Sequence, residues 1–201
     1  MSRPLDRVRA HLDAHFEQLK PDVASVTFVG AEPIDVLRYR SGTSASTGHV
    51  HYVSLGCSRH PMVDPTAVVA DPHRGPRAEV VLRLRDRGPL TGLARSLAVV
   101  AATPAVEGVV LTPDALVDLG TPLWARPSGR APFTAVLLGD SDIADLPLDP
   151  PSDPVRFLAA TPITATEAAW VRLKGAEAMH DAWRSDGVDV SDPDRPAAQP
   201  N

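Results

Sequence analysis

The chain has 201 residues, of which 43% are hydrophobic and 22% are charged, a composition typical of one soluble globular domain. Its formal charge of -5 at pH 7 excludes the global positive field that drives non-specific binding to nucleic acid. The single cysteine, Cys57, excludes an internal disulfide framework and favours a reducing compartment. The longest apolar run, residues 97–102, is far too short to cross a bilayer. We therefore expect a cytoplasmic protein without a membrane span.

The first part of the chain predicts one helix followed by strands. Apolar residues recur at every third or fourth position across residues 5–19, which predicts an amphipathic helix. Segments rich in valine, threonine and aromatic residues predict strands at 23–30, 34–40 and 49–55. Four prolines within residues 58–76 exclude a long regular element there.

The clearest strand is RAEVVLRLRD, residues 77–86. Its apolar residues alternate with charged ones, so one side of the strand is expected to face a core. The other side carries Arg77, Glu79, Arg83 and Arg85. We interpret these four residues as an exposed face that binds a protein partner, with Glu79 held in a bidentate pair by an arginine. A solvated sheet face without a partner is the alternative.

The middle of the chain predicts a buried helix and short strands. Pro89 suits the first position of a helix, and an apolar stripe follows it until Pro104, where we expect the helix to end. Short strands are predicted at 108–111, 133–138 and 155–160, separated by proline-rich connectors.

The end of the chain predicts a capped helix and a tail. The sequence TATE, from Thr164 to Glu167, is a capping box that opens a helix, and Gly187 closes it. Few apolar residues follow, so we expect residues 188–201 to form a C-terminal tail that is loosely ordered or draped over the domain. No repeat or linker divides the remainder, which predicts a single domain over residues 1–187.

Histidines provide the only candidate metal site. His49, His51, His60 and His73 lie close together in sequence, near Cys57, Asp64 and Asp71. A zinc site needs three or four ligands at set distances, and no second cysteine accompanies Cys57, so we predict no metal and no cofactor. A small metal-dependent hydrolase that uses these histidines, with Asp64 or Asp71 as a further ligand, is the competing hypothesis.

The other candidate residues predict no catalytic group. Residues 42–48 contain glycines but lack the spacing of a phosphate-binding loop. Cys57 has no activating partner in its motif and is interpreted as a small packing residue. Paired aspartates such as Asp140 and Asp142 lie in polar loops, where solvent disfavours general acid catalysis. The sequence therefore predicts a protein that is not an enzyme.

The order of these segments resembles the suppressor of fused (SUFU-like) domain family over about residues 20–196. The resemblance rests on Arg77 and Glu79 before the apolar strand, on residues 162–167 opening the last helix with Gly175 inside it, and on Asp192 with Arg195 near the end. It implies a mixed α/β domain, with a central mixed β-sheet, helices packed on its faces, and no enzymatic activity.

The resemblance also implies what the protein binds. In animals, the family restrains a Hedgehog-pathway transcription factor by gripping a short peptide, added as a strand between two domains; this chain resembles the first domain alone. Stand-alone bacterial members are regarded as immunity proteins of polymorphic toxin systems. The resemblance thus implies a non-catalytic protein-binding module, an immunity or regulatory protein whose partner is a protein such as a toxin domain, and not nucleic acid or a membrane.

Composition adds the expected source. Arginine far outnumbers lysine and aspartate outnumbers glutamate, with abundant alanine and proline, which indicates a GC-rich bacterial genome. A structural subunit of a larger assembly stays an open alternative, and the sequence leaves the oligomeric state undetermined.

Overall fold

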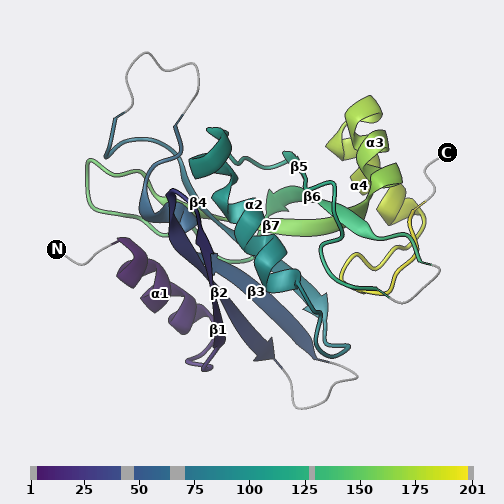
Figure 1. The fold of residues 1–201 in the computed structure, drawn as a ribbon, viewed down its shortest axis with the longest axis horizontal. Coiled ribbons are helices and arrows are strands. Elements are labelled where there is room, and N and C mark those ends of the chain that lie inside the picture. The colour runs from purple at the N-terminus through teal and green to yellow at the C-terminus, as the bar shows by residue number, and fades with distance from the viewer. Residues whose placement is uncertain (1–3, 42–47, 64–70, 127–129, 199–201) are drawn as a thin grey trace.

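The computed structural model describes residues 4–41, 48–63, 71–126 and 130–198 (Figure 1). Its centre is a seven-stranded mixed sheet with the strand order β1-β2-β3-β4-β7-β6-β5. The strands are β1 (Asp22–Phe28), β2 (Ala31–Ser41), β3 (His49–Leu55), β4 (Arg77–Arg85), β5 (Leu116–Asp118), β6 (Phe133–Asp140) and β7 (Val155–Thr164). The helices are α1 (Pro4–His15), α2 (Leu93–Glu107), α3 (Ala165–Lys174) and α4 (Ala176–Ser185).

Two antiparallel groups of strands make up this sheet. Strands β1 to β4 pair in sequence order, and β5, β6 and β7 form the second group. The groups are joined by β4 and β7, which run parallel, with Glu79 opposite Phe157. The mixed α/β class and the central mixed sheet are thus confirmed.

Helices cover both faces of the sheet. Helix α2 covers one face, where alternate residues of β4 such as Val80 and Leu82 form a core with Leu97. Helix α1 lies on the opposite face, where its residues Val8 and Leu12 pack in a second cluster. On that same face, α3 and α4 cover β5, β6 and the end of β7, in a third cluster. The face opposite α2 therefore carries two separate groups of helices.

Helix α2 continues through Pro104 to Glu107, so the prediction that Pro104 ends it was wrong. Proline lacks the N–H group that would bond to the carbonyl of the residue four positions earlier, here Val100. The hydroxyl of the buried Thr103 donates to that carbonyl instead, at 2.8 Å. Gly108, with φ 67°, then forms the left-handed cap of the helix.

Replacing Thr103 with valine is expected to lower the free energy of unfolding by about 1 kcal/mol, because the Val100 carbonyl loses its donor. Thr103→Ser keeps the hydroxyl and is expected to retain that hydrogen bond. Thermal unfolding followed by circular dichroism measures both variants. Equal stability of Thr103→Val and the parent protein would show that the hydroxyl does not compensate for the proline.

The last predicted helix is divided in two. The capping box is confirmed, since the Thr164 hydroxyl accepts from the Glu167 N–H and the Glu167 carboxylate accepts from the Thr164 N–H. Gly175 has φ 90°, a conformation that other residues avoid, and it separates α3 from α4. Leu173, in the last turn of α3 before this break, is 75% exposed.

Two other predictions concern the segment after α2 and the end of the chain. Residues 108–111 are not a strand, and the unpredicted strand β5 lies at 116–118 instead. In the segment that follows α4, Val188 and Val190 pack against the third cluster, and Ala198 is buried in it. Within the described residues, none of the helices has the length and apolar character needed to span a bilayer.

Candidate functional site

The four residues of the predicted binding face lie on β4, but only half of that face is exposed. They alternate with the core residues under α2 and so point to the opposite face of the sheet. Arg83 and Arg85 are exposed there. Arg77 and Glu79 are only 4% and 0% exposed, so the prediction of a continuous exposed face was wrong for these two. The 3-10 helix η1 (Cys57–Arg59), a three-residue element at the start of the proline-rich stretch, folds over their end of β4.

Glu79 is a buried acceptor that holds this covering segment in place. Its carboxylate accepts hydrogen bonds from the hydroxyls of Ser54 and Ser58, the latter at 2.6 Å. It also accepts from the N–H groups of Gly56 and Ser58, at 2.9 and 3.0 Å. Burial raises the pKa of the Glu79 carboxyl, although these four donors act to lower it. The predicted bidentate pair with arginine is not observed, because serine and backbone donors occupy its oxygens.

Arg77 binds the same covering segment from the other side. Its guanidinium donates to the carbonyl oxygens of Ser58 and Arg59, at 2.9 and 3.0 Å. Glu79 accepts from the backbone N–H groups of this segment, and Arg77 donates to its carbonyl oxygens. The two residues together hold η1 in place. Both residues are therefore structural, although the sequence singled them out correctly as unusual members of the strand.

Arg83 lines a hollow on the face of the sheet opposite α2, between the start of the loop after β6 and the C-terminal segment, which we call the Arg83 hollow. It has a volume of about 300 Å³ and is lined by His51, Val81, Arg83, Asp140, Ser141, Asp142 and Val190, among others. Arg83 has no ion pair within the part of the chain that the structure describes. Because α1 and the α3–α4 pair stand apart on this face, the hollow remains open between them. An exposed cation thus stands beside acidic and apolar walls.

His51 lies at the floor of this hollow. Burial, followed by the charge of Arg83, lowers the pKa of His51 to about 4, so the imidazole is neutral at pH 7. Its Nδ1 atom is buried and has no hydrogen-bond partner among the described residues. The hollow is therefore lined by a neutral imidazole next to the arginine.

Arg85 has a different role from Arg83, because it is already paired. Its guanidinium lies 2.6 Å from the carboxylate of Asp189, and its backbone N–H donates to the Ser191 carbonyl at 2.8 Å. These contacts fasten the segment after α4 to the exposed end of β4. Arg85 is therefore paired within the protein, unlike Arg83.

A second buried carboxylate, Glu167, fastens the end of the chain. It lies 2.7 Å from Arg195, whose side chain is 3% exposed. The indole of Trp183 and the N–H of Ala198 also donate to it, at 3.2 and 3.1 Å. Burial acts to raise the pKa of Glu167, but Arg195 and the other donors outweigh it, and the pKa lies below its ordinary value. The sequence identified Glu167 only as the partner of the cap and Arg195 only through family resemblance.

The candidate metal site is not assembled. His49 and His51 lie at the start of β3, whereas His60 follows the other end of that strand and lies 2.8 Å from Glu32. Across the described ranges, no three His, Cys, Asp or Glu side chains are grouped so that they could hold a metal ion. Asp64, one of the proposed ligands, lies outside the described residues.

Cys57 lies beside the buried Glu79. Burial, followed by the charge of Glu79, raises the pKa of the thiol well above its ordinary value. The thiolate is the reactive form of cysteine, so this environment suppresses its nucleophilicity. This agrees with the interpretation of Cys57 as a packing residue.

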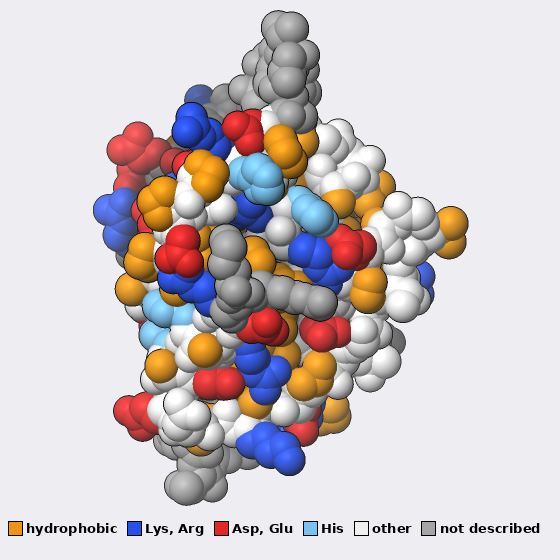
Figure 2. Space-filling model, turned by 90° about the vertical axis from the view of Figure 1, so that its left-hand side faces the viewer, with side chains coloured by type: hydrophobic (Ala, Val, Ile, Leu, Met, Phe, Trp, Pro, Cys, Tyr) orange, Lys and Arg blue, Asp and Glu red, His pale blue; other side chains and the backbone are white. Residues whose placement is uncertain are grey.

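Charged side chains of both signs are mixed on one side of the molecule. On the face that Figure 2 shows, basic and acidic side chains are interspersed with hydrophobic ones and do not gather into a patch of one sign. Recognition at this surface would therefore depend on local pairs of charges, not on a long-range field.

The sheet and its helices define a mixed α/β domain. Its buried charged groups hold covering segments in place, whereas Arg83 is exposed and unpaired, among the described residues, beside a hollow. The family model described as Suppressor of fused protein (SUFU) matches residues 30–196. The chain therefore belongs to the suppressor of fused family, which confirms the resemblance seen in the sequence.

Solved structures share the fold at low sequence identity. A suppressor of fused homologue from Neisseria gonorrhoeae has a TM-score of 0.64 and 17% identity, covering 96% of this chain and 94% of that one. The Sufu–Fu complex gives 0.65 and 16%, covering 96% and 91%. Drosophila Suppressor of Fused gives 0.66 and 18%, covering 98% of this chain but 51% of that one. No curated protein matches the sequence.

Proposed function

We propose that this chain is a non-catalytic protein-binding module, an immunity or regulatory protein that binds and neutralises a partner protein such as a toxin domain. Family membership supports this proposal, and one structure of the same fold is a complex of Sufu with Fu. The observation that carries it is Arg83, an exposed cation that is unpaired among the described residues and stands beside the Arg83 hollow. A carboxylate on a partner would complete this pair.

The environment of the reactive side chains supports a non-catalytic role. The Cys57 thiol has a raised pKa, and the Glu79 carboxylate is fully occupied by four donors. His51 is neutral, and the hydroxyls of Ser141 and Ser191 in the same hollow donate to the Ile143 carbonyl and to the Asp189 carboxylate. We also infer a bacterial, cytoplasmic setting, which the arginine-rich composition and the single cysteine support.

The proposal is tested with the full chain and the product of an adjacent toxin gene. We expect a specific complex of defined stoichiometry, measured by calorimetry and by mass under native conditions, and we expect it to suppress the toxin's activity. Failure to bind any specific partner would count against the proposal. Stoichiometric zinc or manganese in protein purified without an affinity tag would favour the metal-dependent hydrolase instead.

Reversing the charge of Arg83, in Arg83→Glu, is expected to weaken this association about tenfold or more, because the partner's carboxylate would meet a like charge. Stability should change by less than about 0.5 kcal/mol, since an exposed arginine contributes little to it. Arg184→Glu is the matched control, because Arg184 is exposed on α4 and, among the described residues, pairs only with the neighbouring Asp181. An unchanged affinity for Arg83→Glu would exclude the Arg83 hollow as the binding surface.

A further inference from the structure

Strand β1 is an edge of the sheet that lacks the usual protection. Within the described residues it pairs only with β2, so its outer row of backbone N–H and C=O groups is available. Its sequence, DVASVTF, has no proline and no charge after Asp22. Natural edge strands are usually blocked by lysine, proline or a bulge, and here the one irregularity lies at the far end, between Val26 and Phe28. The preceding residues remain regular and open.

Apolar side chains are exposed along this same edge. Val23, on β1, is 52% exposed. Leu19, shortly before the strand, is 41% exposed, and Val29, directly after it, is fully exposed. Such side chains beside an unpaired strand edge are expected to be covered in a functional complex.

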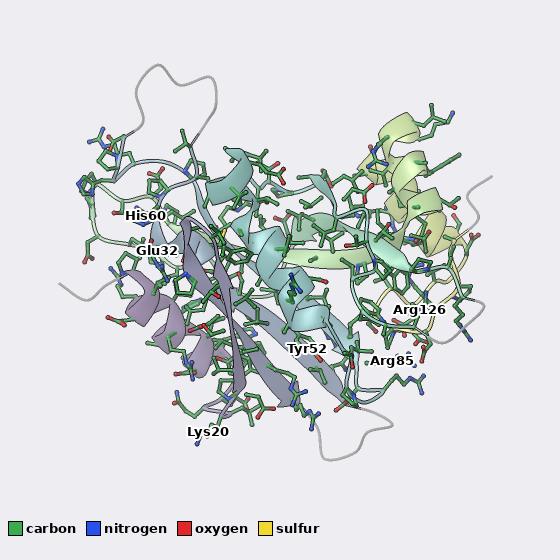
Figure 3. The ribbon with its side chains drawn as sticks, in the orientation of Figure 1. Lys20, Glu32, Tyr52, His60, Arg85 and Arg126 are labelled. Atoms are coloured by element: carbon green, nitrogen blue, oxygen red, sulfur yellow. The ribbon has the colours of Figure 1, made fainter. Side chains whose placement is uncertain are left out.

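A groove runs between this edge and α2, and we call it the β1–α2 groove. Its volume is about 430 Å³, and its apolar lining comprises Ala24, Val26, Val36, Tyr52, Leu90 and Ala94. Ala24 and Val26 are two positions apart on β1 and so face the same side, toward α2. Figure 3 shows Tyr52 at the foot of α2 and Lys20 at the turn that leads into β1. A strand placed beside β1 would direct every second side chain into this groove.

The charges at the rim of the groove define the partner's chemistry. Arg38 is already paired with Asp22, at 2.5 Å. Arg95, on the first turn of α2, lines the groove and is exposed, and no ion pair involves it among the described residues. The uncompensated charge is therefore positive, and it would be matched by an acidic residue.

We propose that the β1 edge and the β1–α2 groove bind an extended, acidic segment of a partner protein as an additional strand of the sheet. Main-chain hydrogen bonds to β1 would supply affinity, and alternate apolar side chains in the groove would supply specificity. An acidic residue of the segment would pair with Arg95. This surface lies on the face of the sheet opposite the Arg83 hollow, so the inference stands or fails separately from it.

Three synthetic peptides test the proposal against the full chain. The first alternates valine with threonine over about nine residues and has aspartate at both ends; the second has lysine in place of aspartate; the third has proline at its centre. We expect the first to bind at least about tenfold more tightly than the second, and the third not to bind at about 1 mM. Amide exchange should slow in β1 when the first peptide binds.

Two variants and one control locate the site. Ala94→Trp fills the groove and Arg95→Glu reverses its charge, and each is expected to weaken the first peptide about tenfold or more while leaving the melting temperature unchanged. Lys174→Glu, an exposed residue on α3, makes the same change in net charge and should have no effect. Equal binding of all three peptides, no binding of any, or unchanged affinity in Ala94→Trp would overturn the proposal. A dimer in sedimentation that Val23→Lys dissociates would also overturn it, by assigning the edge to a second copy.

Discussion

Replacing Arg195 with alanine is expected to lower the free energy of unfolding by about 3–5 kcal/mol. The guanidinium lies 2.7 Å from Glu167, and the exposed fractions of the two side chains are 3% and 0%. Alanine would leave the Glu167 carboxylate buried without its counter-charge. It would also remove the donor to the Pro162 carbonyl, at 2.8 Å. Urea unfolding followed by circular dichroism measures the loss.

An exposed pair provides the control for Arg195→Ala. Arg184 and Asp181 have exposed fractions of 75% and 59%, so Arg184→Ala is expected to cost less than about 0.5 kcal/mol. The pH dependence provides a second readout. Because the pKa of Glu167 is lowered in the folded state, its stabilisation is present above the ordinary glutamate pKa and is lost as the pH falls through the lowered value. Similar losses in the two variants would contradict the role assigned to Arg195.

Replacing Glu79 with alanine is also expected to cost about 3–5 kcal/mol, because it leaves several buried donors without an acceptor and opens a cavity. The two serine hydroxyls can rotate toward other acceptors, but the N–H groups of Gly56 and Ser58 are fixed by the backbone. We expect η1 to detach from β4 before the rest of the domain unfolds. Amide exchange at Gly56 and Ser58, compared with exchange in β4, measures this order.

Glu79→Gln separates charge from shape at this position. It keeps an acceptor oxygen, so its cost should be smaller than that of alanine. The raised pKa of Glu79 means that the folded state favours the protonated carboxyl; stability is therefore greatest below the ordinary pKa and declines as the pH rises through the raised one. Glutamine should remove that decline. A decline of equal size in Glu79→Gln would show that another group causes it.

The strands with simple alternation could be predicted from the sequence. The alternation in 77–86 led to β4 within one residue of its observed end and to the correct core-facing side, because Val80, Leu82 and Leu84 all contact the core under α2. The strand at His49–Leu55 was predicted with its observed bounds. The break at Gly175 could not be predicted from pattern alone, since Trp170, Ala176 and Met179 all contact one cluster across it. The extension of α2 depends on a side-chain hydrogen bond from Thr103 that no periodicity reveals.

The candidate sites could be predicted only in part. The sequence singled out the charged side of β4, but the burial of Arg77 and Glu79 depends on η1, which lies in a proline-rich stretch. The isolation of Arg83 depends on the gap between α1 and the C-terminal helices, a property of packing. The edge position of β1 follows from the strand order, which alternation along one strand does not contain. In each case the missing information was contact between segments distant in sequence.

The parallel pairing of β4 with β7 matters most while the protein is being made. A nascent chain emerging from the ribosome completes β4 long before β7 is translated, so the apolar VVL stretch of β4 waits with one side of its backbone unpaired. Until β7 is made, neighbouring nascent chains can pair with this open strand edge. Slower translation of the connecting segment is therefore expected to lengthen the time for which this edge of β4 is exposed.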